Sequence, residues 1–234
     1  MNNNNSVIDN FTNAAKSYDE KNMQLAPITE NMHFLIRLIL RNISAHARVL
    51  CVGVGTGAEI LSLSESFPEW TFVGIDPSIG MINVCRENLE RAGVLNRCEL
   101  IQGYVGDLPD KENFDVALSI LVAHFVKREE RVSFYQAMCS RLFPEGILIN
   151  TEISYDLNSK EFPLMLKNWE EVQSRMGASP ESLANLAVVL REKLSVIPPI
   201  ETEQLLKQSG IFLPVQFFQA FMISGWYGYK KACR

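Results

Sequence analysis

The chain has 234 residues and a formal net charge of −5 at neutral pH. Hydrophobic residues make up 47% of the sequence and charged residues 21%, an ordinary globular composition that excludes a mainly disordered or fibrous chain. The acidic balance offers no general attraction for a phosphate backbone, so direct nucleic-acid binding is not expected.

The sequence contains no segment with the length and character needed to cross a membrane. Its apolar stretches fall short of the roughly 18 residues that a span requires, and the stretch 35–40 includes Arg37. No apolar segment follows the polar tract 1–5, so no secretion signal is indicated and we expect this tract to be a frayed terminus. These features predict a cytoplasmic protein of one domain, with at most a modest lid and no membrane partner.

The cysteines are odd in number and scattered, without a C-x-x-C pair or a histidine at metal-ligand spacing. A free cysteine in a strand usually acts as a small hydrophobic residue. We therefore expect reduced thiols and no metal site at the five positions, which are Cys51, Cys85, Cys98, Cys139 and Cys233.

From Arg48 onward, short β-rich runs alternate with helical patterns, which is typical of βαβ units and a parallel sheet. The first run is almost wholly apolar, as expected of a strand buried on both faces. The predicted strands span residues 49–52, 71–75, 99–102, 114–121 and 147–153. Residues 142–146, rich in helix breakers, are predicted to form the turn that ends the fourth helix and leads into the fifth strand.

The helix after the second strand has the clearest boundaries. Ser78 can cap its start, and Gly93 supplies a left-handed stop. Its predicted core positions recur at helical spacing and are Met81, Ile82, Cys85 and Leu89.

Helices are also predicted outside this alternation. About two precede the first strand, with a break at 27–29 and with Thr29 or Asn31 as the cap of an apolar helix through Ile39. Two amphipathic helices, at 161–176 and 180–196, form a candidate lid.

The C-terminal part begins where Pro198 and Pro199 stop the preceding helix. A further helix, 200–209, ends at Gly210, and residues 215–229 read as two strands broken at Ser224 and Gly225. We therefore expect a helical cap at 1–47, an α/β core at 48–154, an inserted lid at 155–199 and, at 200–234, a helix and hairpin that complete the sheet.

A glycine-rich turn lies where the first strand should lead into a helix, with glycines at positions 53, 55 and 57. Glycines let a ligand approach the backbone, and the helix N-terminus offers unpaired N–H groups. Roughly 20 residues on, the second strand ends at Asp76, whose carboxylate can accept both hydroxyls of a ribose. The pattern predicts recognition of an adenosine.

The same glycine pattern, read as Gly53, Gly55 and Ala58, also satisfies the dinucleotide-binding fingerprint of nicotinamide dehydrogenases. A dinucleotide fold needs a second parallel βαβ half. Here the last two strands are adjacent in sequence and must pair antiparallel, which disfavours that alternative.

These residues resemble the class I methyltransferases that depend on S-adenosylmethionine (SAM), over residues 48–152 and again at the C-terminal hairpin. The resemblance implies a doubly wound, Rossmann-like sheet of seven strands, mostly parallel with a reversed last strand, and a helical lid. It implies SAM as the cofactor and S-adenosyl-L-homocysteine (SAH) as its product.

The resemblance also implies which residues surround the donor. The glycine turn matches the segment around the methionine part of SAM, Asp76 matches the ribose-binding acid, and residues 77–81 match the segment beside the adenine. Tyr104 stands where the family often has an acidic residue, which weakens that contact, although the ring could stack on the adenine. The implied donor site is Gly53, Val54, Gly55, Thr56, Gly57, Asp76, Pro77, Met81, Tyr104, Val105 and Ser119.

Methyl transfer is an in-line displacement at a sulfonium, in which positioning supplies much of the catalysis and no base is obligatory. For an acceptor that gains from a base, His124, just past the fourth strand, is the best-placed histidine. Tyr18 lies where related enzymes often close over the donor. The structural alternatives are a backbone-bonded turn residue for His124 and a packing aromatic for Tyr18.

The lid and the last strands carry large apolar side chains, which suit a small apolar or aromatic acceptor, the protein core or a homodimer contact. These residues are Phe162, Leu164, Met165, Trp169, Met176, Leu183, Phe217, Phe221 and Trp226. We expect a methyltransferase that acts on a small molecule.

Two alternatives remain open. The region after the fifth strand also resembles the carboxy-SAM synthases of tRNA wobble-uridine modification, which make a carboxylated SAM from prephenate and hold its carboxylate with an arginine. Here Val188 occupies that place and Arg191 is the nearest candidate, which favours ordinary SAM because a guanidinium is the natural partner of a carboxylate. The other alternative is a non-catalytic SAM-binding regulatory protein.

Overall fold

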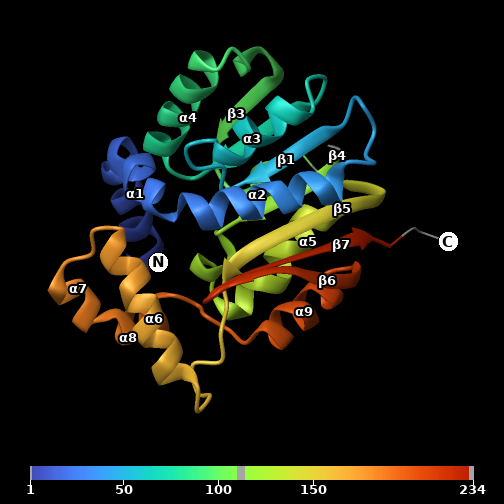
Figure 1. The fold of residues 1–234 in the computed structure, drawn as a ribbon. Helices are drawn as coiled ribbons and strands as arrows, with labels where there is room; N and C mark the ends of the chain where they lie inside the picture. Colours follow the sequence, from blue (N-terminus) through green and yellow to red (C-terminus); the bar gives the residue numbers. More distant parts are fainter. Residues whose placement is uncertain (1, 110–113, 232–234) are drawn as a thin grey trace.

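The computed structural model describes residues 2–109 and 114–231, and for residues 2–7 it describes the backbone only. The described residues form one seven-stranded sheet in the order β3-β2-β1-β4-β5-β7-β6 (Figure 1). The strands are β1 (Arg48–Val52), β2 (Thr71–Asp76), β3 (Cys98–Gln102), β4 (Phe114–Ile120), β5 (Leu142–Ile153), β6 (Ile211–Ala220) and β7 (Ile223–Lys230).

Strands β1 to β5 pair in parallel, and β7 is antiparallel to both β5 and β6. This confirms the predicted fold class, including the reversed last strand. Parallel strands covered on both faces read as apolar runs, and β1 is buried at four of its five positions.

Helices cover both faces of the sheet and enclose two apolar clusters. One cluster packs α2 (Ala26–Leu40), α3 (Ala58–Ser66), α4 (Ile79–Arg91) and α6 (Phe162–Arg175) against one face. The other packs α5 (Arg131–Arg141) and α9 (Pro199–Gln208) against the opposite face. Short helical turns at η2 (Leu95–Arg97), η3 (Val105–Asp107), η4 (Ala123–Phe125) and η5 (Arg128–Glu130) join these elements.

Helix α4 confirms its predicted boundaries. The Ser78 hydroxyl accepts a hydrogen bond from the Met81 backbone N–H at 3.2 Å, and Gly93 has a φ of 72°. The four predicted core residues of this helix are all buried.

The N-terminal region differs from its prediction. Most of the tract expected to be frayed is helical, because it forms the start of α1 (Asn2–Asn22). The short turn η1 (Met23–Leu25) joins α1 to α2. Neither Thr29 nor Asn31 caps α2, which begins at Ala26 with Pro27 in its first turn. The first turn of a helix tolerates proline because the backbone N–H that proline lacks would have no helical partner there. The Thr29 hydroxyl, which does not cap the helix, donates to the Leu25 carbonyl at 3.3 Å.

Two predicted turns were misplaced. Strand β5 already begins at Leu142, and residues 143–146 form an irregularity inside it, where the pairing with β4 shifts register. The last two strands break at Phe221 and Met222, not at Ser224 and Gly225, which lie within β7.

The second lid helix, predicted at 180–196, is broken. It consists of α7 (Pro180–Ala184), α8 (Leu186–Val188) and the π-helical turn η6 (Val189–Lys193). The proline pair also behaves differently from the prediction, since Pro199 is the first residue of α9. In Figure 1, α1 and α6 lie at the same end of the sheet.

Four described cysteines are free thiols, and Cys233 lies outside the described residues. Among the residues that the structure describes, no helix is both long and apolar enough to cross a membrane.

Candidate active site

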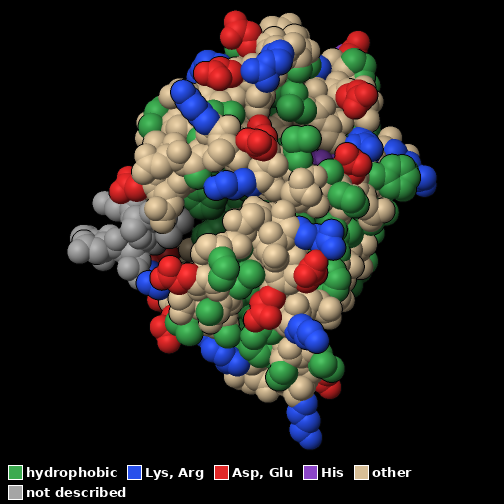
Figure 2. Space-filling model, turned by 60° about the vertical axis from the view of Figure 1, so that its left-hand side comes forward, with side chains coloured by type: hydrophobic (Ala, Val, Ile, Leu, Met, Phe, Trp, Pro, Cys, Tyr) green, Lys and Arg blue, Asp and Glu red, His purple; other side chains and the backbone are tan. Residues whose placement is uncertain are grey.

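A cavity of about 520 Å³ opens at the carboxyl ends of β1, β2 and β4. Its floor is the glycine turn after β1 together with the ends of β2 and β4, and its roof comes from α1 and α6. Figure 2 shows the hollow on this face, with apolar side chains inside it. In doubly wound sheets, ligands bind at the carboxyl ends of the strands, where the strand order reverses.

The glycine turn brings bare backbone to the cavity wall. The N–H groups of Gly53 and Val54 both donate to the Ile75 carbonyl, at 2.8 and 3.1 Å, which ties the turn to the end of β2. A Cβ at Gly53 would lie 2.4 Å from a methyl carbon of Val122, so the wall admits no side chain there.

Asp76 is held at the cavity edge by backbone groups. One carboxylate oxygen accepts from the Gly55 N–H at 3.0 Å and the other from the Ser78 N–H at 2.8 Å. Burial raises the pKa of Asp76, and the two N–H donors act in the opposite direction. A carboxylate oxygen accepts more than one hydrogen bond, so both oxygens keep capacity toward the cavity.

Most of the predicted site residues come together on this wall. Those that line the cavity are Tyr18, Gly53, Gly55, Asp76, Pro77, Met81, Tyr104, Val105 and His124. Four residues that were predicted to bind SAM are not among the lining residues: Val54, Thr56, Gly57 and Ser119. Val54 and Ser119 are buried, and the Thr56 hydroxyl donates to Asp19 of α1 at 2.6 Å.

The structure adds wall residues that the sequence analysis missed. Helix α1 contributes Ile8, Phe11 and Asn22, η1 contributes Leu25, and the lid contributes Gln173 besides the expected Trp169 and Met176. Phe11 packs edge-on against Phe125 of η4, with ring centroids 5.2 Å apart. The available signal was the spacing of apolar residues in an otherwise polar N-terminal segment.

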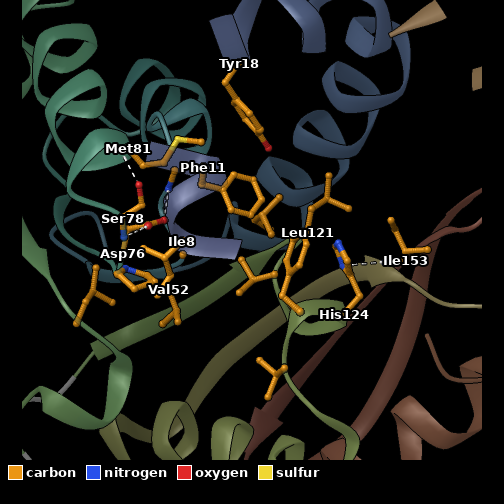
Figure 3. Close-up of a pocket in the computed structure, with 18 of the residues that line it drawn as sticks. Ile8, Phe11, Tyr18, Val52, Asp76, Ser78, Met81, Leu121, His124 and Ile153 are labelled. Atoms are coloured by element: carbon orange, nitrogen blue, oxygen red, sulfur yellow. Dashed lines mark hydrogen bonds between the residues drawn. The ribbon is translucent and has the colours of Figure 1, made fainter. Parts of the chain in front are cut away.

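His124 projects from η4 into the cavity wall, and its side chain is buried. Its Nδ1 accepts a hydrogen bond from the Ile153 backbone N–H at 3.3 Å, drawn as the dashed line in Figure 3. Burial, reinforced by the nearby Arg131 cation, lowers the pKa of His124 to about 3. The ring is therefore neutral near pH 7, and it combines a wall position with the backbone bond of the structural alternative.

Tyr18 points from α1 into the cavity, toward the side on which Leu121 and His124 lie (Figure 3). Burial raises the pKa of Tyr18, and the neighbouring Asn22 side chain lowers it. The phenol keeps its proton near neutral pH.

A buried ion pair supports the wall behind His124. Arg131 pairs with Glu152 of β5 and also donates to the Ser195 carbonyl, while Thr202 donates to Glu152 at 2.8 Å. The Ser195 N–H in turn donates to the His124 carbonyl at 2.8 Å. The network fixes η4 and the end of the lid to the sheet.

Positive charge is missing from the described cavity wall. None of its lining residues is a lysine or an arginine. Arg191, the candidate for holding a donor carboxylate, donates to the Leu157 carbonyl at 2.5 Å and to Asn158 at 3.2 Å, and its guanidinium lies over the Phe162 ring. Among the described residues there is also no group of three His, Cys, Asp or Glu side chains that could hold a metal ion.

Comparison with known proteins finds similarity to methyltransferases and to carboxy-SAM synthases. Residues 49–146 match the family model described as a methyltransferase domain. The carboxy-S-adenosyl-L-methionine synthase of Methylococcus capsulatus is 25% identical over 182 residues, which are 77% of this chain and 75% of that protein. The erythromycin 3''-O-methyltransferase of Saccharopolyspora erythraea is 32% identical over 108 residues, 45% of this chain and 34% of that protein.

A solved structure agrees in fold over almost the whole chain. The O-methyltransferase family protein from Burkholderia thailandensis superimposes with a TM-score of 0.69 at 11% identity, covering 98% of this chain and 63% of that one. The chain thus spans less than two thirds of the length of that structural relative. Together with the sheet order, this agreement shows the Rossmann-like fold of the class I SAM-dependent methyltransferases, and residues 49–146 carry the match to a methyltransferase domain.

Proposed function

We propose that the chain transfers the methyl group of SAM to a small acceptor that is largely apolar or aromatic. The observation that carries this proposal is the position of Asp76, held by two backbone N–H groups at the edge of a deep cavity, beside bare backbone. SAM supplies an activated methyl group on a sulfonium. The residues of the chain have to bind it, orient it and exclude water.

The residues of the wall support SAM as the ligand. In this proposal Asp76 accepts the ribose hydroxyls, and the methionine part lies against the turn at Gly53 and Gly55. The half-exposed ring of Tyr104 can cover the adenine at the cavity mouth. The other proposed adenine contacts on the wall are Pro77, Met81 and Val105.

The far end of the cavity supports an apolar acceptor. Trp169 and Met176 of α6 and Leu25 of η1 form its roof, and Ile153 and Ile223 close it at the ends of β5 and β7. Apolar walls with a few polar groups are typical of small-molecule sites. The small-molecule O-methyltransferase among the relatives supports the same class of acceptor.

Replacing Asp76 by alanine tests the ribose assignment. The change removes hydrogen bonds to a charged acceptor, and we expect D76A to bind SAM more than about tenfold more weakly than the wild type. Isothermal titration calorimetry of the full chain measures the affinity.

A matched control is E65A, which removes the same charge from an exposed position on α3. This control should bind SAM as the wild type does. Unchanged SAM affinity in D76A, with folding verified by thermal melting, would refute the ribose assignment.

A second candidate is a carboxy-SAM synthase, which the similarity to the Methylococcus protein favours. The cavity wall disfavours a carboxy-SAM synthase, because the described lining residues include no lysine or arginine and Arg191 donates hydrogen bonds to Leu157 and Asn158. A carboxylate buried without a cationic partner is costly.

Native mass spectrometry of the purified protein separates the two candidates. Co-purified SAM or SAH, without a carboxylated donor, is the expected result. A bound mass equal to that of SAM plus CO₂, as expected when a carboxyl group replaces one methyl hydrogen, would favour the synthase.

A further inference from the structure

The imidazole of His124 is fixed in one tautomer by its backbone contact. Nδ1 accepts the Ile153 N–H, so the single proton of the neutral ring is on Nε2. The bond between the Ser195 N–H and the His124 carbonyl holds the residue itself in place. The ring therefore presents an N–H donor, rather than a free lone pair, to its surroundings.

The charged groups around the ring oppose its protonation. Arg131 of α5 lies close enough to lower the pKa of His124, and the Glu152 carboxylate of β5 is already paired with Arg131. Among the described lining residues the acids are Asp76 and the exposed Glu130, and Tyr18 of α1, which also lines the cavity, is a neutral phenol. Accepting a proton at neutral pH would cost the ring its bond to Ile153.

The apolar wall that surrounds this donor makes it selective. A buried N–H left without a partner costs free energy comparable to a lost hydrogen bond, so a ligand without an oxygen at this place is penalised. The described lining residues include no lysine or arginine to balance an anionic ligand. The wall therefore favours an uncharged ligand that brings one hydrogen-bond-accepting oxygen.

We propose that His124 binds the acceptor as a fixed N–H donor and selects uncharged acceptors that carry an oxygen, such as a carbonyl, beside the methylated atom. The proposal rests on the function proposed above, because it takes this end of the cavity as the acceptor site. It replaces the general-base role expected from the sequence. The proton that the acceptor loses on methylation passes to water and not to His124.

The tautomer is observable without any acceptor. In the full chain labelled with ¹⁵N-histidine and saturated with SAH, NMR should find His124 neutral, with its proton on Nε2, and without a titration midpoint between about pH 6 and 9. The variants H33Q and H46Q assign the other two imidazoles. A proton on Nδ1, or a midpoint in that range, would overturn the proposal.

Selection by the His124 N–H is tested with two probes of matched shape, acetophenone and α-methylstyrene. Acetophenone has a carbonyl oxygen where α-methylstyrene has a methylene group. The SAH-bound wild type should bind acetophenone at least about fivefold more tightly than the hydrocarbon. Equal binding of the two probes, or no binding of the ketone, would overturn the proposed selectivity.

Two substitutions separate the role of the His124 Nε2–H as a hydrogen-bond donor from the structural role of the ring. In H124N the amide oxygen can replace Nδ1 and keep the Ile153 bond, but the Nε2 donor is lost, so the preference for the ketone should disappear. H33Q, which changes a histidine of α2 that is not among the lining residues, should keep the preference. A preference retained in H124N would overturn the proposal, and NMR of the wild type decides the matter if H124N does not fold.

The order of the measurements separates the two proposals. If SAH fails to bind the wild type, the proposed function fails. If SAH binds but His124 titrates or the probes bind equally, only the role assigned to His124 fails.

Discussion

Gly57 lies where the glycine turn enters α3, and both its backbone and its surroundings exclude a side chain. Its φ is 87°, in the left-handed region that L-residues avoid. A Cβ at this position would also lie 2.8 Å from the Cys85 sulfur of α4. The residue therefore allows α3 and α4 to pack closely at the cavity floor, although it does not line the cavity itself.

Alanine at three glycines separates these two reasons. G57A should lose roughly 2–4 kcal/mol of unfolding free energy, because left-handed strain of about 1–2 kcal/mol is added to the contact with Cys85. G93A, with a φ of 72° and nothing within 4 Å of the new Cβ, should show the strain alone.

G106A has neither cost, since its Cβ also meets nothing within 4 Å and its φ is not in the left-handed region. Urea unfolding of the ligand-free variants measures all three. A G57A variant as stable as G93A would show that the contact with Cys85 is unimportant.

At the scale of residues, the sequence located what depends on local spacing. Gly53, Gly55 and Asp76 were found because a turn and the end of the next parallel strand must meet at one edge of the sheet. The orientation of Thr56 could not be predicted, since its hydroxyl bonds to Asp19, 37 positions away. The tautomer of His124 likewise depends on a distant partner, the Ile153 N–H.

Helix α6 connects the core to the cavity through one side chain. Trp169 is 2% exposed, belongs to the larger apolar cluster and lines the cavity roof. On the opposite side of the same helix, Leu164 is 70% exposed. The helix is thus anchored by its inner face alone.

Truncating these two side chains tests that anchoring. W169A should destabilise the ligand-free protein by about 3–5 kcal/mol, the usual cost of removing a buried aromatic side chain. L164A, on the exposed face, should stay within about 0.5 kcal/mol of the wild type. Urea unfolding monitored by circular dichroism provides both values, and a loss below about 1 kcal/mol in W169A would mean that α6 is not packed on the core.

At the scale of elements, strand and helix types were predictable and some boundaries were not. Gly225 was predicted to be a turn residue, but it lies inside β7. A Cβ at this position would lie 2.8 Å from the Phe217 ring, and this close approach explains the glycine. Glycine inside a strand often marks a close approach of neighbouring atoms, and sequence alone does not separate this case from a turn. The start of α1 was predicted to be frayed because residues 1–5 are polar. The contact between Thr12 of α1 and Ser78, at 2.9 Å, is tertiary and could not be read from that tract.

For the whole molecule, the sheet order follows from the alternation of strands and helices along the sequence and from the hairpin of β6 and β7. β1 lies between β2 and β4, so the strand order reverses there, and the cavity opens at this reversal. The floor of the cavity was therefore predictable from the sequence. The lid and Tyr18 were expected at its roof, but the part that Ile8 and Phe11 of α1 take beside α6 was not, because α1 and α6 are far apart in the sequence. The division of the chain at residues 48, 155 and 200 stays a prediction.

The central claim is that the adenosyl donor lies along the glycine turn with its ribose on Asp76. A crystal structure of the full chain with SAH tests this claim most directly. We expect both ribose hydroxyls within about 3.2 Å of the Asp76 carboxylate oxygens, and the thioether sulfur on the side of the cavity that faces His124. SAH bound elsewhere, or a crevice that stays empty at saturating SAH, would contradict the account.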